Sequence, residues 1–373
     1  MKITPQSLTI SQLLGQTNER YLIPPYQRRY SWLERQIREL IEDVSMIEAN
    51  DSHLLGSIVC LTGGHVANLN ELEVVDGQQR LTTISILLSC LKERFLEEGA
   101  SESSKVSDIE KLLEAKSISG QVVEKIKLES IDAKDYAALL NNDVDVTNQC
   151  LKNAFDIVRA WTQEMPLEKL KNFWYHLVNQ SFVIRLDVSN AKDAFKLFET
   201  INNRGLRLSQ TDIVKNFLLG NAARFGPTHL TSARSSWAKL VVNLDGINSD
   251  AFFRYYLTAV TTKRVTASKV IAQFKWMFHF GVKEAKNLPE QQLYVDLEDS
   301  VDEDVDQGGE EKFEAPKTEQ EVENIKKPVS FKKFMDVLIS YSKVYGELVR
   351  ADTGNTQIDR HLKNLKMIKA TQA

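Results

Sequence analysis

Five consecutive residues, Asp76-Gly77-Gln78-Gln79-Arg80, have the types and spacing of a phosphate-binding corner. A glycine lets the backbone approach an anion closely, and the planar guanidinium of Arg80 can bind two phosphate oxygens at once. The structural alternative is an ordinary Asp-Gly turn followed by a solvated arginine. The sequence therefore marks this corner as a candidate nucleotide site.

The residues on either side predict how the corner is held. Leu72, Val74 and Val75 are apolar and suited to a buried strand, whereas from Leu81 to Leu91 the apolar residues recur at helical spacing. The corner is then the end of a strand and the start of a helix. The helix dipole and its unpaired N–H groups favour an anion there.

A second polar loop lies in the stretch Tyr21–Trp32. Pro24 and Pro25 exclude helix and predict an extended approach, while Ser31, with Glu34 three residues later, predicts a capped helix start. Residues 27–29, Gln-Arg-Arg, are then presented on a rigid loop. Core aromatic residues with surface arginines are the structural alternative. Because a second Gln-Arg pair repeats the first, the two loops could face one ligand.

A third cluster follows the helical stretch from Phe195 to Ile201. Asn203-Arg204-Gly205 resembles a helix C-cap, and Ser209 with Asp212 predicts the start of the next helix. The oxygens of Glu199 and Asn202 are ligands of the kind that magnesium takes beside a polyphosphate, and Arg204 could reach phosphate. A purely structural corner between two helices gives no reason for Glu199 or Arg204.

The rest of the chain alternates weaker strand and helix signals. Strands are predicted at 54–61, in a hairpin with 71–75, at 125–128 and at 182–187, and a strand or turn is predicted from residue 7. Helices are predicted at 146–161, 167–178, 237–244, 251–259, 270–280, 331–348 and 358–369. The fold class is therefore α+β with a mostly α-helical second part.

Composition limits the class of protein. The 373 residues carry a net charge of −4, yet residues 296–323 hold 13 acidic residues against two lysines, so the remainder is mildly basic. That permits contact with nucleic acid. No apolar run is long enough to span a bilayer, and Cys60, Cys90 and Cys150 are predicted to pack in a reducing cytoplasm. The sequence has no P-loop.

The three stretches IPPYQRRYSW, VVDGQQRLTT and LFETINNRGLRLSQTDIVKN, in this order, resemble the N-terminal domain of GmrSD-type restriction enzymes over roughly residues 8–222. That resemblance implies a ParB/sulfiredoxin-like domain that binds and hydrolyses nucleoside triphosphate and senses modified DNA in phage defence. The implied nucleotide and Mg²⁺ site has Asp76, Gln79, Arg80 and Glu199 as catalytic residues. Its implied binding residues are Gln27, Arg28, Gly77, Gln78, Asn202 and Arg204, with Glu199 and Asn202 on the metal.

The resulting organisation has four parts. Residues 1–222 form the nucleotide-binding domain, 223–290 a helical extension, 291–328 an acidic mobile linker and 329–373 a C-terminal helical segment. The implied partners are DNA, including modified phage DNA, a nuclease domain or subunit of the His-Asn-His type, and a second copy of the chain, with no membrane.

Nuclease activity is not expected from this chain alone, since its six histidines are scattered. The alternatives for the missing nuclease are a chain shortened at its end, a separate subunit, or a stand-alone switch. The competing functions are a non-catalytic ParB-like module that binds DNA under nucleotide control and, least favoured, a nuclease using Asp76 and Glu199.

Overall fold

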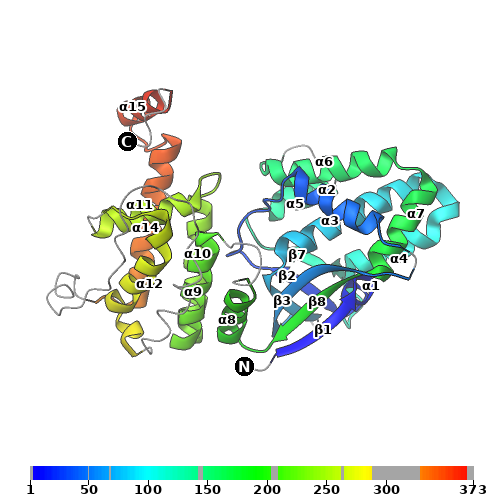
Figure 1. Cartoon of the computed structure of the whole chain (residues 1–373), viewed down its shortest axis with the longest axis horizontal. Helices are drawn as coiled ribbons and strands as arrows, with labels where there is room; N and C mark the ends of the chain where they lie inside the picture. Colours follow the sequence, from blue (N-terminus) through cyan, green and yellow to red (C-terminus); the bar gives the residue numbers. More distant parts are fainter. Residues whose placement is uncertain are drawn as a thin grey trace. The chain divides into compact units, whose positions relative to one another are not determined.

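A six-stranded mixed sheet forms the base of the first part of the chain (Figure 1). Its strands are β1 (Ile3–Thr9), β2 (Glu19–Ile23), β3 (His53–Val66), β4 (Leu69–Asp76), β7 (Ile126–Leu128) and β8 (Ser181–Val188), in the order β1-β8-β3-β4-β2-β7. β3 pairs antiparallel with β4 and parallel with β8. β5 (Glu114–Lys116) and β6 (Val122–Glu124) form a separate antiparallel pair.

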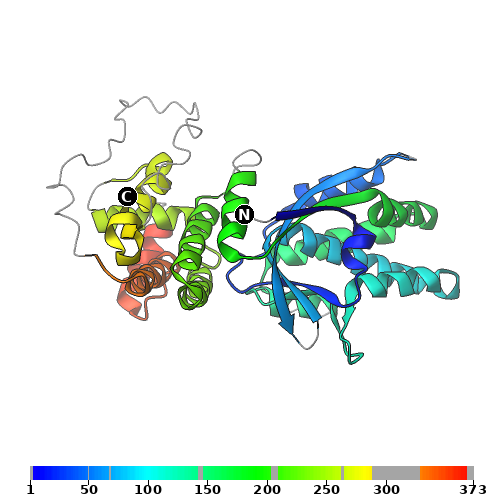
Figure 2. The same ribbon diagram turned by 90° about the horizontal axis from the view of Figure 1, so that it is seen from below.

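The computed structural model describes residues 3–48, 50–66, 69–141, 146–202, 209–261, 264–287 and 328–367. The chain divides into two compact units, Met1–Phe198 and Glu199–Ala373. In the second unit the described residues are almost entirely helical (Figure 2). None of the helices in the described ranges is long and apolar enough to cross a membrane.

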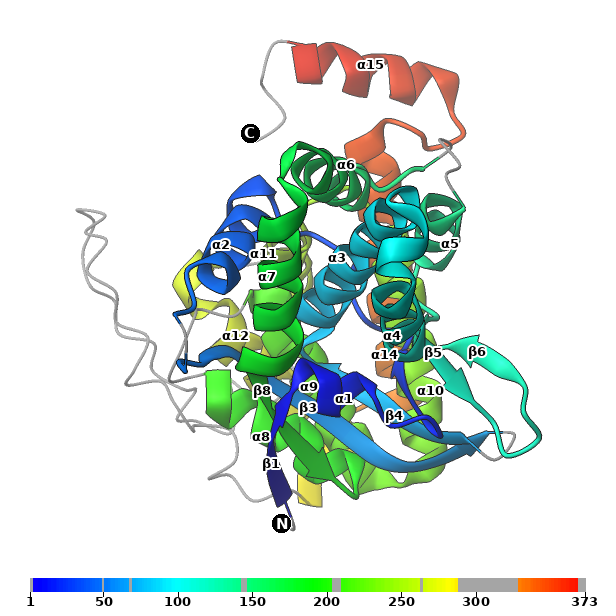
Figure 3. The same cartoon turned by 90° about the vertical axis from the view of Figure 1, so that its right-hand side faces the viewer.

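Helices cover one face of the sheet (Figure 3). Those of the first unit are α1 (Ile10–Leu14), α2 (Glu34–Ser45), α3 (Gln78–Glu97), α4 (Ser103–Leu113), α5 (Ala133–Leu140), α6 (Gln149–Glu164) and α7 (Leu167–Tyr175). α8 (Ala191–Asn202) follows β8 and crosses the boundary between the units. Those of the second unit are α9 (Gln210–Phe225), α10 (Pro227–Asn243), α11 (Ser249–Thr261), α12 (Val270–Gly281), α14 (Phe331–Arg350) and α15 (Thr356–Met367).

α3 is the centre of the first unit's core. Every residue from Leu81 to Leu91 is buried, and the helix packs against α4 and α6. Ile58 and Val74 of the sheet lie in the same apolar cluster as Leu81 and Leu88. Burial of so much apolar surface fixes the direction of α3, and with it the position of the corner where the helix begins.

The predicted combination of a sheet with a mostly helical second part is confirmed, and the sheet has six strands. The strands predicted at 54–61, 71–75, 125–128 and 182–187 are all present, as are the hairpin and the Ser209 helix cap. The ParB/sulfiredoxin-like assignment stays a prediction. All of the predicted acidic linker, residues 291–328, lies outside the described residues except Pro328.

The predicted Ser31 helix cap is wrong. α2 begins at Glu34, with Leu33 at the N-cap position and the side chain of Gln36 accepting from the Leu33 N–H. Ser31 is instead committed to tertiary contacts, because its N–H donates to Gln79 and its hydroxyl accepts from Arg28. Long-range hydrogen bonds thus override the local capping signal.

Candidate functional site

The predicted corner between strand and helix is present between β4 and α3. β4 ends at Asp76, Gly77 adopts φ = 96°, and α3 starts at Gln78. A Cβ atom at position 77 would lie 2.9 Å from Cγ1 of Ile58, so both the left-handed backbone and the close approach of β3 require glycine. Because Gly77 has no side chain, the first turn of α3 carries no side-chain cap.

Arg80 is half-buried in that first helical turn, against the backbone of β3. Its Nη1 donates to the Ser57 carbonyl at 2.7 Å, and its guanidinium lies over Gly56, which has φ = +118°. Burial lowers the pKa of Arg80, while the negative charge of Asp76 acts in the opposite direction. An arginine stays protonated despite such a shift, so Arg80 presents a fixed positive charge at the corner.

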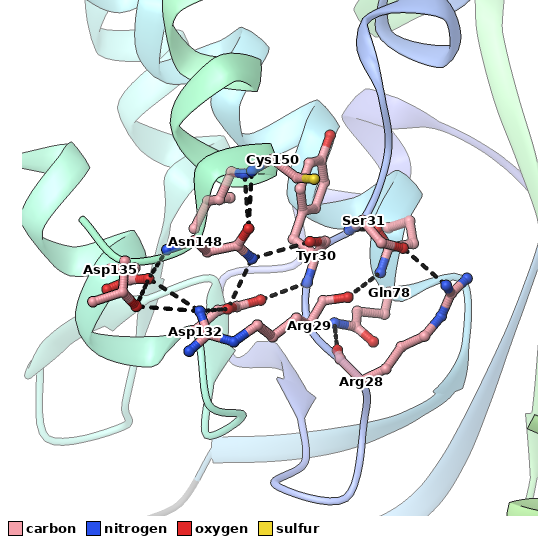
Figure 4. Close-up of polar contacts among 12 residues, drawn as sticks. Arg28, Arg29, Tyr30, Ser31, Gln78, Asp132, Asp135, Asn148 and Cys150 are labelled. Carbon is pink, nitrogen blue, oxygen red and sulfur yellow. Dashed lines mark hydrogen bonds and ion pairs between the residues drawn. The ribbon is translucent and has the colours of Figure 1, made fainter. Parts of the chain in front are cut away.

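The loop that carries Gln27 and Arg28 lies on this corner. Gln27 is buried, and its Nε2 donates to the Val74 and Val75 carbonyls at 2.9 Å each. Gln78 Nε2 in turn donates to the Arg28 carbonyl at 2.7 Å (Figure 4). The two Gln-Arg motifs are therefore neighbours in space, and the prediction that they face one ligand stays a prediction.

Gln79 holds the next part of the loop. Its Nε2 donates to the Arg29 carbonyl at 3.2 Å, and its Oε1 accepts from the Ser31 N–H at 2.8 Å. The Arg28 side chain is exposed and donates through Nη1 to the Ser31 hydroxyl at 2.8 Å (Figure 4). Gln27, Gln78 and Gln79 thus each use the side-chain amide to join the loop to the corner.

A second set of polar side chains, which the sequence interpretation missed, holds the opposite side of the loop (Figure 4). Asp132 is fully buried and accepts from the Tyr30 N–H at 2.5 Å, and Asn148 Nδ2 donates to the Tyr30 carbonyl at 3.0 Å. Arg29 forms ion pairs with Asp132 at 3.3 Å and with Asp135 at 3.4 Å. An Asn directly before the helix that starts at Gln149 is the one local signal that could have identified Asn148.

The two aspartates differ in their electrostatics. Burial raises the pKa of Asp132 above its usual value, although hydrogen bonds from Tyr30 and Asn148 act against that rise. For Asp135 burial also raises the pKa, but hydrogen bonds from Thr147 and Asn148 outweigh it, and the pKa is lowered. The loop is therefore anchored to one carboxylate whose charged form is penalised by burial and another whose charged form is stabilised by its donors.

The third motif is located only in part. Glu199 and Asn202 lie in the last turn of α8, but their side chains, and all of Arg204, lie outside the described residues. The magnesium ligands predicted from the sequence therefore stay predictions. In the part of the chain that the structure describes, no three His, Cys, Asp or Glu side chains are grouped as metal ligands would be.

Residues of all three motifs also lie in a match to a known protein family. The model described as "GmrSD restriction endonuclease, N-terminal domain" matches residues 10–219, a range that contains all three motifs. No curated protein matches the chain.

Proposed function

The chain belongs to the GmrSD restriction endonuclease, N-terminal domain family, and we propose that it is the regulatory part of a DNA restriction system that binds and hydrolyses a nucleoside triphosphate. One observation carries the proposal. Arg80 and the uncapped start of α3 lie together at the β4–α3 corner, and the loop bearing Arg28 is hydrogen-bonded onto that same corner. Two arginines and a helix N-terminus are groups that bind phosphate.

Each group has a proposed role. Arg80 binds the phosphate chain and stabilises the charge that develops on the transferred phosphoryl group, and the first N–H groups of α3, directly after the Gly77 turn, bind the same anion. Arg28 binds phosphate from the loop. Asp76, whose charge acts on Arg80, is the proposed base for the attacking water.

The third motif completes the proposal on sequence grounds. Glu199 and Asn202 are the proposed protein ligands of a Mg²⁺ ion that accompanies the triphosphate, and Arg204 is a third phosphate contact. The oxygens of a glutamate and an asparagine are hard donors that suit magnesium.

A non-catalytic module that binds nucleotide only to change shape is the second candidate function. Gln27 and Gln78 donate their Nε2 atoms to backbone carbonyls. Gln79 uses both its amide nitrogen and its amide oxygen on the loop backbone, so its side chain is already engaged and is not available to orient water. That leaves Asp76 as the one carboxylate within the first two motifs. A site that binds phosphate but has few groups to orient and deprotonate a water molecule would bind nucleotide without hydrolysing it.

Phosphate release separates the two functions. The purified chain is incubated with each of the common nucleoside triphosphates and Mg²⁺, with and without modified DNA, and both binding and released phosphate are measured. We expect Arg80→Ala to lower phosphate release at least about tenfold while the chain stays folded, since alanine favours helix. Arg94→Ala, on the same helix but paired with Glu98, is the matched control.

Three outcomes are informative. Binding with turnover that Arg80→Ala abolishes and Arg94→Ala leaves intact supports hydrolysis at this corner. Binding without turnover supports the switch. Turnover that is unchanged in well-folded Arg80→Ala protein would sink the assignment of the corner.

A further inference from the structure

The backbone of the loop from Arg28 to Ser31 is held by side chains on two sides. The α3 side chains Gln78 and Gln79 bind the polar groups of residues 28, 29 and 31, as described above. Neither of them binds Tyr30. Both polar backbone groups of Tyr30 are bound instead by Asp132 and Asn148, which lie more than 100 residues along the chain and outside all three motifs.

Asn148 joins three elements through one side chain. Its Oδ1 caps α6 by accepting from the N–H groups of Cys150 and Leu151 at 3.0 and 3.3 Å. Its Nδ2 donates both to the Tyr30 carbonyl and to Asp132 Oδ1, the latter at 2.9 Å (Figure 4). The helix cap fixes the amide, so the amide holds the Tyr30 carbonyl in a fixed place relative to α6.

The two adjacent arginines are thereby given different tasks. Arg29 turns toward Asp132 and Asp135, which offset its charge at a half-buried position. Arg28, one residue earlier, is exposed. The backbone hydrogen bonds at Arg28, Arg29 and Tyr30 set which way each of these side chains leaves the loop.

We propose that Asp132 and Asn148 are positioning residues that hold the Tyr30 backbone and so place the Arg28 guanidinium for an anionic ligand of the phosphate class at the β4–α3 corner. The inference rests on the proposed function, because it assigns the binding of that ligand to Arg28. A loop already fixed in its binding conformation loses little freedom when the ligand binds, and its affinity is higher for that reason.

Asn148→Ser is the most selective variant. Serine keeps a side-chain oxygen that can cap α6, but it has no amide to donate to the Tyr30 carbonyl. Asn248→Ser is the matched control, because Asn248 likewise accepts from two N–H groups at the start of α11, at 3.1 and 3.2 Å. Asp132→Asn is a second variant, since both of its oxygens accept from donors and an amide nitrogen would face one of them.

Two measurements are made on the full chain and on each variant. Hydrogen exchange of the peptide that contains Tyr30 reports the hold on the loop without any nucleotide. Titration with a non-hydrolysable nucleoside triphosphate and Mg²⁺ reports affinity. We expect Asn148→Ser and Asp132→Asn to speed exchange at Tyr30 and to weaken affinity about tenfold, whereas Asn248→Ser changes neither.

Asn148→Ser in an Arg28→Ala background distinguishes a positioning role of Asn148 from a purely structural one. If Asn148 acts through Arg28, adding Asn148→Ser to Arg28→Ala should weaken affinity no further. Full additivity, or wild-type affinity in Asn148→Ser protein whose Tyr30 exchange is faster, would overturn the positioning role. Unchanged exchange in both variants would overturn the hold itself. If the wild-type chain binds no triphosphate, the proposed function fails and this inference fails with it, whereas the other outcomes reject the inference alone.

Discussion

The guanidinium of Arg80 occupies the space in which Gly56 would carry a side chain. A Cβ atom built on Gly56 would lie 2.6 Å from Nη2 and 2.9 Å from Cζ of Arg80. Gly56 lies at a β-bulge in the pairing of β3 with β8, and the next residue, Ser57, accepts the Arg80 hydrogen bond. The bulge in β3 thus forms the backbone surface against which Arg80, the proposed phosphate-binding arginine, packs.

Gly56→Ala should therefore disable the corner although it replaces none of the corner's own residues. The new methyl group must push the guanidinium away, and the backbone at φ = +118° adds strain of about 1–3 kcal/mol. We expect phosphate release to fall about as far as in Arg80→Ala protein. Phosphate release and the free energy of unfolding are measured together.

Gly63→Ala is the control for Gly56→Ala. Gly63 also lies in β3 and has φ = +102°, but nothing lies within 4 Å of its added Cβ. It should lose stability through backbone strain and keep its activity. In an Arg80→Ala background, Gly56→Ala should cost no more stability than Gly63→Ala, and a larger cost there would contradict the contact.

Alanine variants of Arg28 and Arg29 should have different effects, one on ligand binding and the other on stability. Arg29→Ala leaves Asp132 and Asp135 without their cation in a largely buried place, so we expect a loss of about 2–4 kcal/mol in the free energy of unfolding. Arg28→Ala, at an exposed position, should cost less than about 0.5 kcal/mol but weaken triphosphate binding. Denaturant unfolding and nucleotide titration of both variants check this, and equal stability losses would argue against the division of tasks.

The purified chain should leave DNA uncut while it releases phosphate from nucleotide. Hydrolysis of a phosphodiester takes a positioned water and usually a metal, and the six histidines are spread from residue 53 to residue 361. Plain and phage-modified plasmids are incubated with the chain, Mg²⁺ or Mn²⁺ and nucleotide, and nicks are counted on a gel. Cleavage that disappears with Asp76→Asn or Glu199→Gln would promote the nuclease hypothesis.

The β4–α3 corner could be predicted because its signals are local. Leu72, Val74 and Val75 before the corner and the periodic residues from Leu81 onward set the strand and helix, and Gly77 marks the turn between them. The prediction that the two Gln-Arg loops face one ligand stays a prediction, although Gln78 does bind the Arg28 carbonyl. The corner itself is a property of one short stretch of chain.

The long-range hydrogen bonds that hold the site together could not be predicted from short stretches of chain. The glutamines resemble ligand-binding groups until their long-range hydrogen bonds are seen, such as that of Gln27 to Val74 across 47 residues. Asp132 and Asn148 reach Tyr30 across more than 100 residues, and no local pattern reports such a contact. The wrong Ser31 cap has the same cause, since a distant Gln79 takes the Ser31 N–H.

Lys125 should give the first unit a stability that rises with pH. Its side chain is buried, and its Nζ donates to the Gln16 and Glu19 carbonyls at 2.6 and 2.9 Å. Burial lowers its pKa from 10.5 to about 8, although the charge of Glu19 acts in the opposite direction. Between these two values the unfolded chain binds more protons than the folded chain, so the free energy of unfolding increases as pH rises.

The difference between the wild-type chain and Lys125→Met isolates this effect. Below pH 8 both states hold the proton, and the cost of burying the charge is present in full. From pH 7 to pH 10 the wild type should gain about 2 kcal/mol relative to Lys125→Met, a variant in which nothing titrates at this position. Lys127→Met, two residues away on β7 and paired with Glu129, should follow the wild-type curve. Urea unfolding at each pH measures the three curves, and a Lys125→Met curve parallel to that of the wild type would show that Lys125 does not change its protonation on folding.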